Sequence, residues 1–123
     1  MEKTELARIA EETLRGLRDL IEEQHAWSAG EMEDQSPFGD FLDGVLSIDR
    51  VVKQPLFGDG ETLLHWEVLL ALGGPTVRLE IDDSGSGRVV VAWWSAPYHL
   101  TFDGVLRELG EELSAYDEAM FGV

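Results

Sequence analysis

The segment 61–96 most constrains the fold, because it holds three apolar runs separated by turn sequences. The runs cover residues 63–72, 76–82 and 88–96, and the turns are Gly73-Gly74-Pro75 and residues 83–87. In the first two runs, side chains alternate with the period of two that is typical of a pleated strand. The third run is apolar on both sides, so it lies centrally in a sheet or something else must cover Val89, Val91 and Trp93. The segment therefore predicts a three-stranded antiparallel meander.

The same period predicts which side chains of these strands enter the core. We assign Trp66 and Trp94 to the core, because both share the parity of the inward positions. Trp93 has the opposite parity, and it either packs beneath the segment 19–49 or forms an interface with His65 and Arg78. The expected inward positions of the first two strands are Leu64, Trp66, Val68, Leu70, Leu72, Val77, Leu79 and Ile81.

Amphipathic patterns predict a helix on each side of the meander. Residues 4–26 place apolar side chains at steps of three and four, with Thr4 as the expected N-cap. Gly16 lies in the middle of this helix at a cost of about 1 kcal/mol relative to alanine. We expect either a close approach of another element there or a tolerated glycine. After Pro97, Thr101 is expected to cap the second helix.

The remaining segments complete one α+β domain. Residues 38–44 predict a short helical turn and residues 45–53 a first strand, so the order is helix, four strands, helix. This order predicts a four-stranded antiparallel sheet, a meander, with the N-terminal and the C-terminal helix packed on one face. A chain of 123 residues fits a single domain, 1–123.

Composition indicates a soluble protein. The chain has no cysteine, which excludes disulfides and thiolate metal sites and suits a reducing cytoplasm. Its amino terminus has no apolar h-region, and no apolar run approaches the roughly 20 residues that a membrane span requires. We therefore expect a cytoplasmic location.

Net charge is the most informative total, because 25 Asp and Glu residues face 9 Lys and Arg residues, a formal charge of −16. Such a field repels nucleic acid and anionic membranes, and it speeds encounters with basic surfaces. The segment 19–49 contributes acids without a single Lys or Arg. We therefore expect a basic protein surface as the partner, with no direct binding of nucleic acid or membrane. Salt adaptation is the alternative explanation of the same charge.

No constellation in the sequence predicts catalysis, a metal or a cofactor. The run that begins at Asp82 opens like a calcium loop, but Trp93 stands where such a loop needs a bidentate glutamate. Ser95, His99 and Asp103 are four residues apart, yet an intervening proline prevents the regular helix that would place them on one face. We therefore expect a protein that is not an enzyme and that carries no cofactor.

Rows of carboxylates and one tryptophan are the candidate partner-binding residues. On a helix, side chains three or four apart lie about 5–6 Å from each other, and each strand of a duplex presents a phosphate about every 3.4 Å along its axis. A groove of Lys and Arg that binds nucleic acid would accept such rows. The alternative is a solvated acidic face that keeps the protein soluble. The candidates are Asp19, Glu22, Glu23, Glu31, Glu33, Asp34, Glu108, Glu111, Glu112, Glu118 and Trp93.

Three stretches resemble a group of short acidic proteins from phages, plasmids and other mobile elements. They are residues 70–77 with Gly73-Gly74-Pro75, residues 87–94 ending in Trp93-Trp94, and the lead-in at residues 41–48. In that group a strand ends in Gly-Gly-Pro, and a later strand closes in two aromatic residues. The resemblance implies a small α+β domain and an inhibitor of host defence, of the anti-restriction or anti-CRISPR class, without a catalytic residue. The chain differs from the group in carrying Ser95-Ala96 after the tryptophan pair.

These observations leave three hypotheses. The first is a non-enzymatic acidic inhibitor that occupies the nucleic-acid-binding surface of a host defence complex or nuclease as a DNA mimic. The second is an immunity or antitoxin protein that neutralises a basic toxin through a few hot spots such as Trp93 or Trp27. The third is an acidic oligomeric domain, with a homodimer formed through the apolar outer face of residues 88–96.

Overall fold

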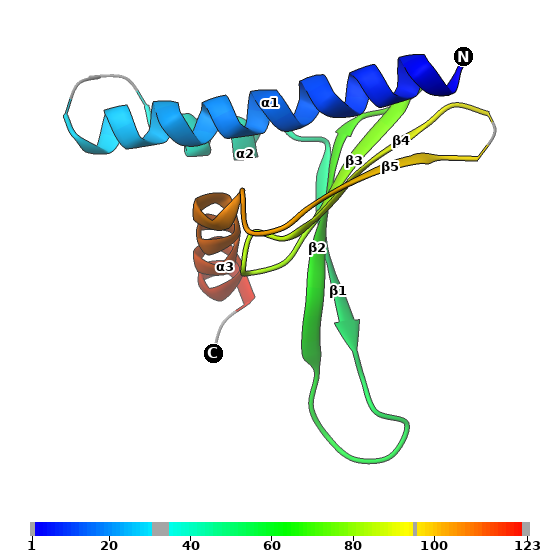
Figure 1. Ribbon diagram of the computed structural model, residues 1–123. Coiled ribbons are helices and arrows are strands. Elements are labelled where there is room, and N and C mark those ends of the chain that lie inside the picture. The colour runs from blue at the N-terminus through cyan, green and yellow to red at the C-terminus, as the bar shows by residue number, and fades with distance from the viewer. Residues whose placement is uncertain (1, 31–34, 95, 122–123) are drawn as a thin grey trace.

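The computed structural model describes residues 2–30, 35–94 and 96–121, and it shows three helices and one five-stranded sheet (Figure 1). The expected α+β class and antiparallel sheet are confirmed, but the sheet has five strands where four were expected. Among the described residues, no helix combines the length and apolar character needed to cross a membrane. In chain order the elements are α1 (Lys3–Ser28), α2 (Pro37–Gly44), β1 (Ser47–Lys53), β2 (Thr62–Ala71), β3 (Thr76–Ile81), β4 (Gly87–Ala92), β5 (Tyr98–Phe102) and α3 (Arg107–Phe121).

The sheet is a meander in which each strand pairs with the next one along the chain. The register places Val68 opposite Leu79, Leu79 opposite Val89, and Val89 opposite Leu100. Because paired residues point to the same face, this row crosses the sheet as one apolar band. Helices α1 and α3 add their apolar stripes to the same core cluster, which contains Leu6, Ala10, Leu17, Ile21, Leu106, Leu109 and Leu113.

The fifth strand ends in Thr101 and Phe102, which were expected to begin the second helix. Tyr98, Leu100 and Phe102 pack against the core, whereas Thr101 lies exposed between them and does not cap a helix. Pairing with β4 satisfies the backbone groups of this segment. The helix that follows begins only at Arg107, after the chain has left the sheet.

The parity predicted for β4 is wrong. Val89 and Val91 belong to the core, whereas Val90 points to the opposite face, where it is only 1% exposed. Strand β4 therefore lacks the exposed apolar outer face that was expected of residues 88–96. Trp94 is not a core residue, because its side chain is 92% exposed and its φ of 61° lies in the left-handed region beyond the end of the strand.

Strand β2 buries fewer of its expected inward side chains than its alternation predicts. Trp66 and Val68 are buried, as are the inward residues of β3. Leu64 is 47% exposed, because β2 pairs with β3 only from Trp66 onward and extends past the core toward its hairpin with β1. Leu72 is 71% exposed, because it follows the last residue of the strand.

The first helix and α2 are fixed to each other at their polar ends. Helix α1 begins at Lys3 with Glu2 as N-cap, so Thr4 lies inside the helix and does not cap it. The expected short helix at residues 38–44 is confirmed as α2, whose N-cap Ser36 accepts a hydrogen bond from the Gly39 amide. The side-chain oxygen of Gln24 on α1 accepts from the Ser36 hydroxyl at 2.9 Å and from the Phe38 amide at 3.1 Å.

Candidate partner-binding surface and pockets

The structure brings two of the predicted acidic rows to the same end of the molecule. Asp19, Glu22 and Glu23 are exposed on the last turns of α1, and Glu111 and Glu118 are exposed on α3. The two helices approach each other at His25 on α1 and Glu108 on α3. The Nε2 atom of His25 lies 3.7 Å from a carboxylate oxygen of Glu108. The candidates Glu31, Glu33 and Asp34 lie outside the described residues.

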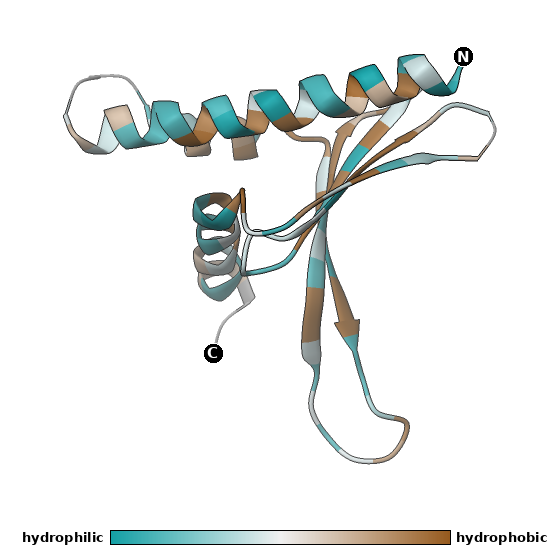
Figure 2. Cartoon of the chain, in the orientation of Figure 1, coloured by the Kyte–Doolittle hydropathy of each residue, from teal (hydrophilic) through white to brown (hydrophobic). Residues whose placement is uncertain are grey.

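Helix α2 adds its own carboxylates to this end, and Figure 1 shows the three helices gathered on one side of the sheet. Figure 2 shows hydrophilic residues recurring along α1 and α3. We call this surface the acidic end. Its described members are Asp19, Glu22, Glu23, Asp40, Asp43, Glu108, Glu111, Glu112 and Glu118.

The cations of the chain lie mostly away from the acidic end. Within residues 19–30, 37–44 and 107–121, the only Lys or Arg is Arg107, whose Nε atom lies 3.8 Å from a carboxylate oxygen of Glu111. Both side chains of that pair are well exposed, so water and salt screen it. Lys3 and Arg8 lie further back along α1, whereas Arg15 and Arg18 lie one helical turn before Asp19 and Glu22 and border the acidic end. The carboxylates of the acidic end outnumber the cations within and beside it, so this surface carries net negative charge.

Two arginines of the sheet, Arg78 and Arg88, pair with carboxylates on the sheet itself. Glu80 is buried, and it accepts hydrogen bonds from Arg88 at 2.9 Å and from Arg78 at 3.0 Å. Burial by itself raises the pKa of the Glu80 carboxyl, but the hydrogen bonds and charges of the two arginines outweigh it, so the pKa lies below its ordinary value. These pairs form a network on the sheet face opposite the core.

Trp93 is a packing residue at the end of the sheet. Its side chain packs against the core cluster and covers Gly74, where an added Cβ would overlap the indole ring. It therefore lies on the face opposite to His65 and Arg78, because it shares the parity of Val91. Its ring meets that of Trp94 edge-on, with centroids 6.0 Å apart and planes at 87°. The exposure of Trp94 was not predicted, because the parity of the apolar run assigned this residue to the core.

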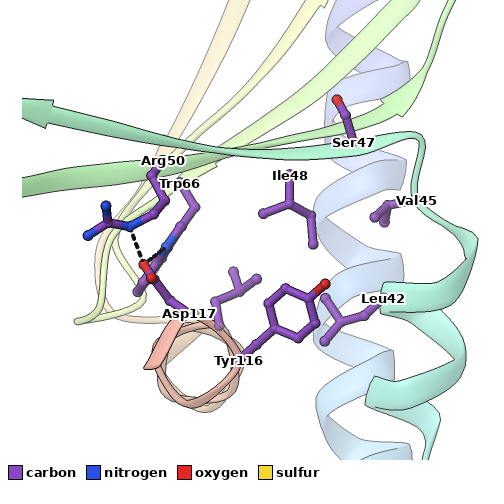
Figure 3. Close-up of a pocket in the computed structure, with 9 residues that line it drawn as sticks. Leu42, Val45, Ser47, Ile48, Arg50, Trp66, Tyr116 and Asp117 are labelled. Atoms are coloured by element: carbon purple, nitrogen blue, oxygen red, sulfur yellow. Dashed lines mark hydrogen bonds and ion pairs between the residues drawn. The ribbon is translucent and has the colours of Figure 1, made fainter. Parts of the chain in front are cut away.

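A pocket of about 230 Å³ lies where α3 crosses β1 and β2 (Figure 3). One carboxylate oxygen of Asp117 accepts hydrogen bonds from Arg50 at 2.7 Å and from the indole nitrogen of Trp66 at 2.8 Å. The hydrogen bond with Asp117 raises the pKa of the Arg50 guanidinium above its ordinary value. In Figure 3 the aromatic ring of Tyr116 and the side chain of Ile48 lie beside this group around the open space.

The chemistry of this pocket is structural, because its charged groups neutralise each other. Asp117 joins α3 to both β1 and β2, and its side chain is only 13% exposed. Sequence reasoning missed this contact, because Arg50 and Asp117 are 67 residues apart. No local pattern marks such a pair, so only the folded chain identifies it.

A second, shallower groove of about 360 Å³ runs along the flank of α1 beside α2 and the end of β2. Gly16 is one of its lining residues, and nothing lies within 4 Å of a Cβ placed there. The expected close approach of another element at Gly16 is therefore wrong. The rest of the lining is Thr13, Leu17, Leu20, Glu23, Phe41 and Leu70.

Of the residues weighed for a metal or for hydrolysis, Ser95 lies outside the described residues, and Asp82, His99 and Asp103 make contacts of other kinds. One carboxylate oxygen of Asp82 accepts from the Ser84 amide, the Ser84 hydroxyl and the Ser86 amide, and thereby shapes the turn between β3 and β4. His99 contacts Arg88, whereas Asp103 accepts a hydrogen bond from Ser86. Among the described residues, no three His, Cys, Asp or Glu side chains gather to hold a metal ion.

Comparisons with known proteins add no relative to these observations. The chain matches no protein-family model, no curated protein and no solved structure.

Proposed function

We propose that the protein is a non-enzymatic inhibitor from a mobile element, and that its acidic end binds the nucleic-acid-binding surface of a host defence complex or nuclease. The observation that carries this proposal is the gathering of carboxylates from α1, α2 and α3, where Arg107 is the only Lys or Arg among the described residues of that surface. The choice of a defence protein follows from the resemblance to acidic proteins of mobile elements. Such partners work in the cytoplasm, where we place this protein.

The acidic end would act as a substitute for phosphates. A protein that binds nucleic acid lines its groove with Lys and Arg, and it gains affinity when counterions are released. Carboxylates on α1 and α3 recur at three- and four-residue steps, which places neighbours about 5–6 Å apart. Because exposed charges are screened within about 8–10 Å at physiological ionic strength, binding should weaken steeply as salt rises.

Two matched variants test the proposal. In the first, six acids of the acidic end become amides: Asp19→Asn, Glu22→Gln, Glu23→Gln, Glu108→Gln, Glu111→Gln and Glu112→Gln. In the control, an equal number of exposed acids elsewhere become amides: Glu2→Gln, Glu5→Gln, Glu11→Gln, Asp49→Asn, Asp59→Asn and Glu61→Gln. Each protein is immobilised and exposed to host lysate at low salt, and bound proteins are then eluted with duplex DNA.

We expect wild type and the control variant to release nucleic-acid-binding proteins when DNA is added, because the DNA and the acidic end compete for the same cationic groove. The acidic-end variant should capture at least tenfold less of the same proteins. Equal capture by the two variants would show that total charge matters rather than this surface, and the proposal would fail. Release by salt but not by DNA would equally contradict it.

A second candidate is an immunity protein that neutralises one basic toxin, and Trp94 is the observation that favours it. Trp94 is 92% exposed, and its ring meets that of Trp93 edge-on. Tryptophan is enriched among the few residues that carry most of the binding energy of a protein–protein interface. Trp94→Ala should then abolish protection of cells against a toxin encoded beside this gene. Full protection by the variant would remove this candidate.

A further inference from the structure

The groove beside Gly16 has a chemical character that the acidic end alone does not explain. Its interior is apolar, with Leu20 on α1, Phe41 on α2 and Leu70 on β2, and Glu23 stands at its edge. The acidic rows supply only charge, whereas this groove also offers apolar surface to a partner. It therefore adds shape and specificity to a contact that is otherwise electrostatic.

Gly16 keeps the groove open. It lies in the middle of a 26-residue helix, where glycine is the least favourable residue apart from proline. The structure shows no steric reason for glycine, because a Cβ at this position would meet nothing within 4 Å. A larger side chain there would instead occupy the groove that Gly16 lines. The glycine therefore leaves this part of the groove open.

The rim of the groove indicates the charge of that occupant. Glu12, Gly16, Asp19 and Glu23 follow each other at steps of four, three and four, so they form one stripe along α1. At 100° per residue, Arg15 and Arg18 point away from the groove-lining residues Thr13, Leu17 and Leu20, although Arg15 borders the stripe beside Glu12 and Asp19. A second copy of this chain does not suit the rim, because each copy carries a formal charge of −16.

We propose that the Gly16 groove binds a basic amphipathic helix of the partner protein. One apolar side chain of that helix fills the space among Leu20, Phe41 and Leu70, and Lys or Arg side chains one turn away pair with the acidic stripe. This inference rests on the proposed function, since both require a cationic partner. It goes further by naming the kind of segment that is recognised and the place where it docks.

Two synthetic helical peptides with equal numbers of lysine provide the test. In one peptide, leucines recur at alternating intervals of three and four residues, so they form one face of the helix. In the other peptide, glutamine replaces each of these leucines. Binding of each labelled peptide to wild type, to Gly16→Leu and to the control Ser114→Leu is measured by fluorescence anisotropy. Ser114 is exposed on α3 away from the groove, so its substitution adds the same side chain elsewhere.

We expect wild type and Ser114→Leu to bind the leucine peptide at least tenfold more tightly than the glutamine peptide. Gly16→Leu should fold, because the site is open, and it should lose this preference while still binding the glutamine peptide. Equal affinity of wild type for the two peptides, no binding of the leucine peptide, or an unchanged preference in Gly16→Leu would each overturn the groove proposal.

An NMR spectrum of the backbone amides of the protein locates the bound peptide independently of these affinities. With the leucine peptide, the largest amide chemical-shift changes should include Leu20, Phe41 and Leu70, and changes confined to α3 would contradict the groove. The glutamine peptide separates the two proposals. Its binding without any leucine preference leaves the proposed function standing and removes the groove, whereas failure of both peptides to bind counts against both.

Discussion

Asp117→Ala removes the acceptor that Arg50 on β1 and Trp66 on β2 share, so it tests how α3 is held on the sheet. The indole N–H of Trp66 donates to Asp117 at 2.8 Å, and the residue is only 2% exposed, so water cannot easily replace the lost acceptor. A hydrogen bond to a charged group contributes about 1.5–3 kcal/mol. Arg50 is partly exposed and also lies near Glu61, so we expect its loss of a partner to add little.

The free energy of unfolding should therefore fall by about 1.5–3 kcal/mol in Asp117→Ala. Asp117→Asn keeps an oxygen that can accept from Trp66, so it should lose less than half as much. Glu118→Ala is the control on the same helix, because its exposed side chain should matter by at most about 0.5 kcal/mol. Urea unfolding followed by circular dichroism measures all three, and an unchanged denaturant slope shows that only stability has changed.

Two results would refute this account of the pocket. One is an Asp117→Ala protein whose unfolding free energy equals that of wild type, because the indole would then find another partner. The other is an Asp117→Asn protein that is as unstable as Asp117→Ala, because the charge rather than the hydrogen bond would then hold α3. The indole proton of Trp66 reports on the same contact, and its exchange with solvent should quicken in Asp117→Ala but not in Asp117→Asn.

Three further substitutions follow from the structure. The pKa of Glu80 is lower than its ordinary 4.5 in the folded chain, so its ion pairs stabilise the protein above about pH 4.5 and lose their effect as pH falls through the lowered value. Glu80→Gln should therefore cost about 2 kcal/mol at pH 7 and progressively less as pH falls below 4.5, and a deficit in urea unfolding that does not shrink on acidification would contradict this. Gly74→Ala drives a methyl group into the Trp93 ring and should cost about 1–3 kcal/mol, whereas Gly44→Ala, which meets open space, should not destabilise; thermal melts of equal midpoint would refute the overlap. Gly16→Ala should raise the free energy of unfolding by about 1 kcal/mol, and a loss of stability would show that the glycine is needed for the fold.

Charge and periodicity were readable from the sequence because both are local. Helix α1, the short α2 and four of the strands follow from repeats of 3.6 and 2, which the backbone imposes on each segment by itself. The acids of the acidic end on α1 and α3 were identified in the same way, residue by residue, whereas Asp40 and Asp43 on α2 were not among the candidates. Their assembly was not, because it depends on how α1, α2 and α3 pack on the sheet and on the contact between His25 and Glu108.

Strand β5 shows that a local pattern does not always distinguish a strand from a helix. Its five residues alternate between polar and apolar, yet Leu100 and Phe102 also fit the start of an amphipathic helix. Pairing with β4 decides in favour of a strand, and the paired residues run from Val91 with Tyr98 to Gly87 with Phe102, which lie outside any local helical repeat. The parity of β4 was undecidable for a similar reason, since both of its faces are apolar and only the pairing of Leu79 with Val89 selects one.

By itself, the sequence determined an acidic α+β domain with an antiparallel meander, because hydrophobic periodicity and net charge are properties of the chain. The tertiary structure alone decided that Trp94 faces solvent, that Asp117 holds Arg50 and Trp66, and that Gly16 opens a groove. These features arise from contacts between segments far apart in the chain, and such contacts leave no period in the sequence from which they can be read.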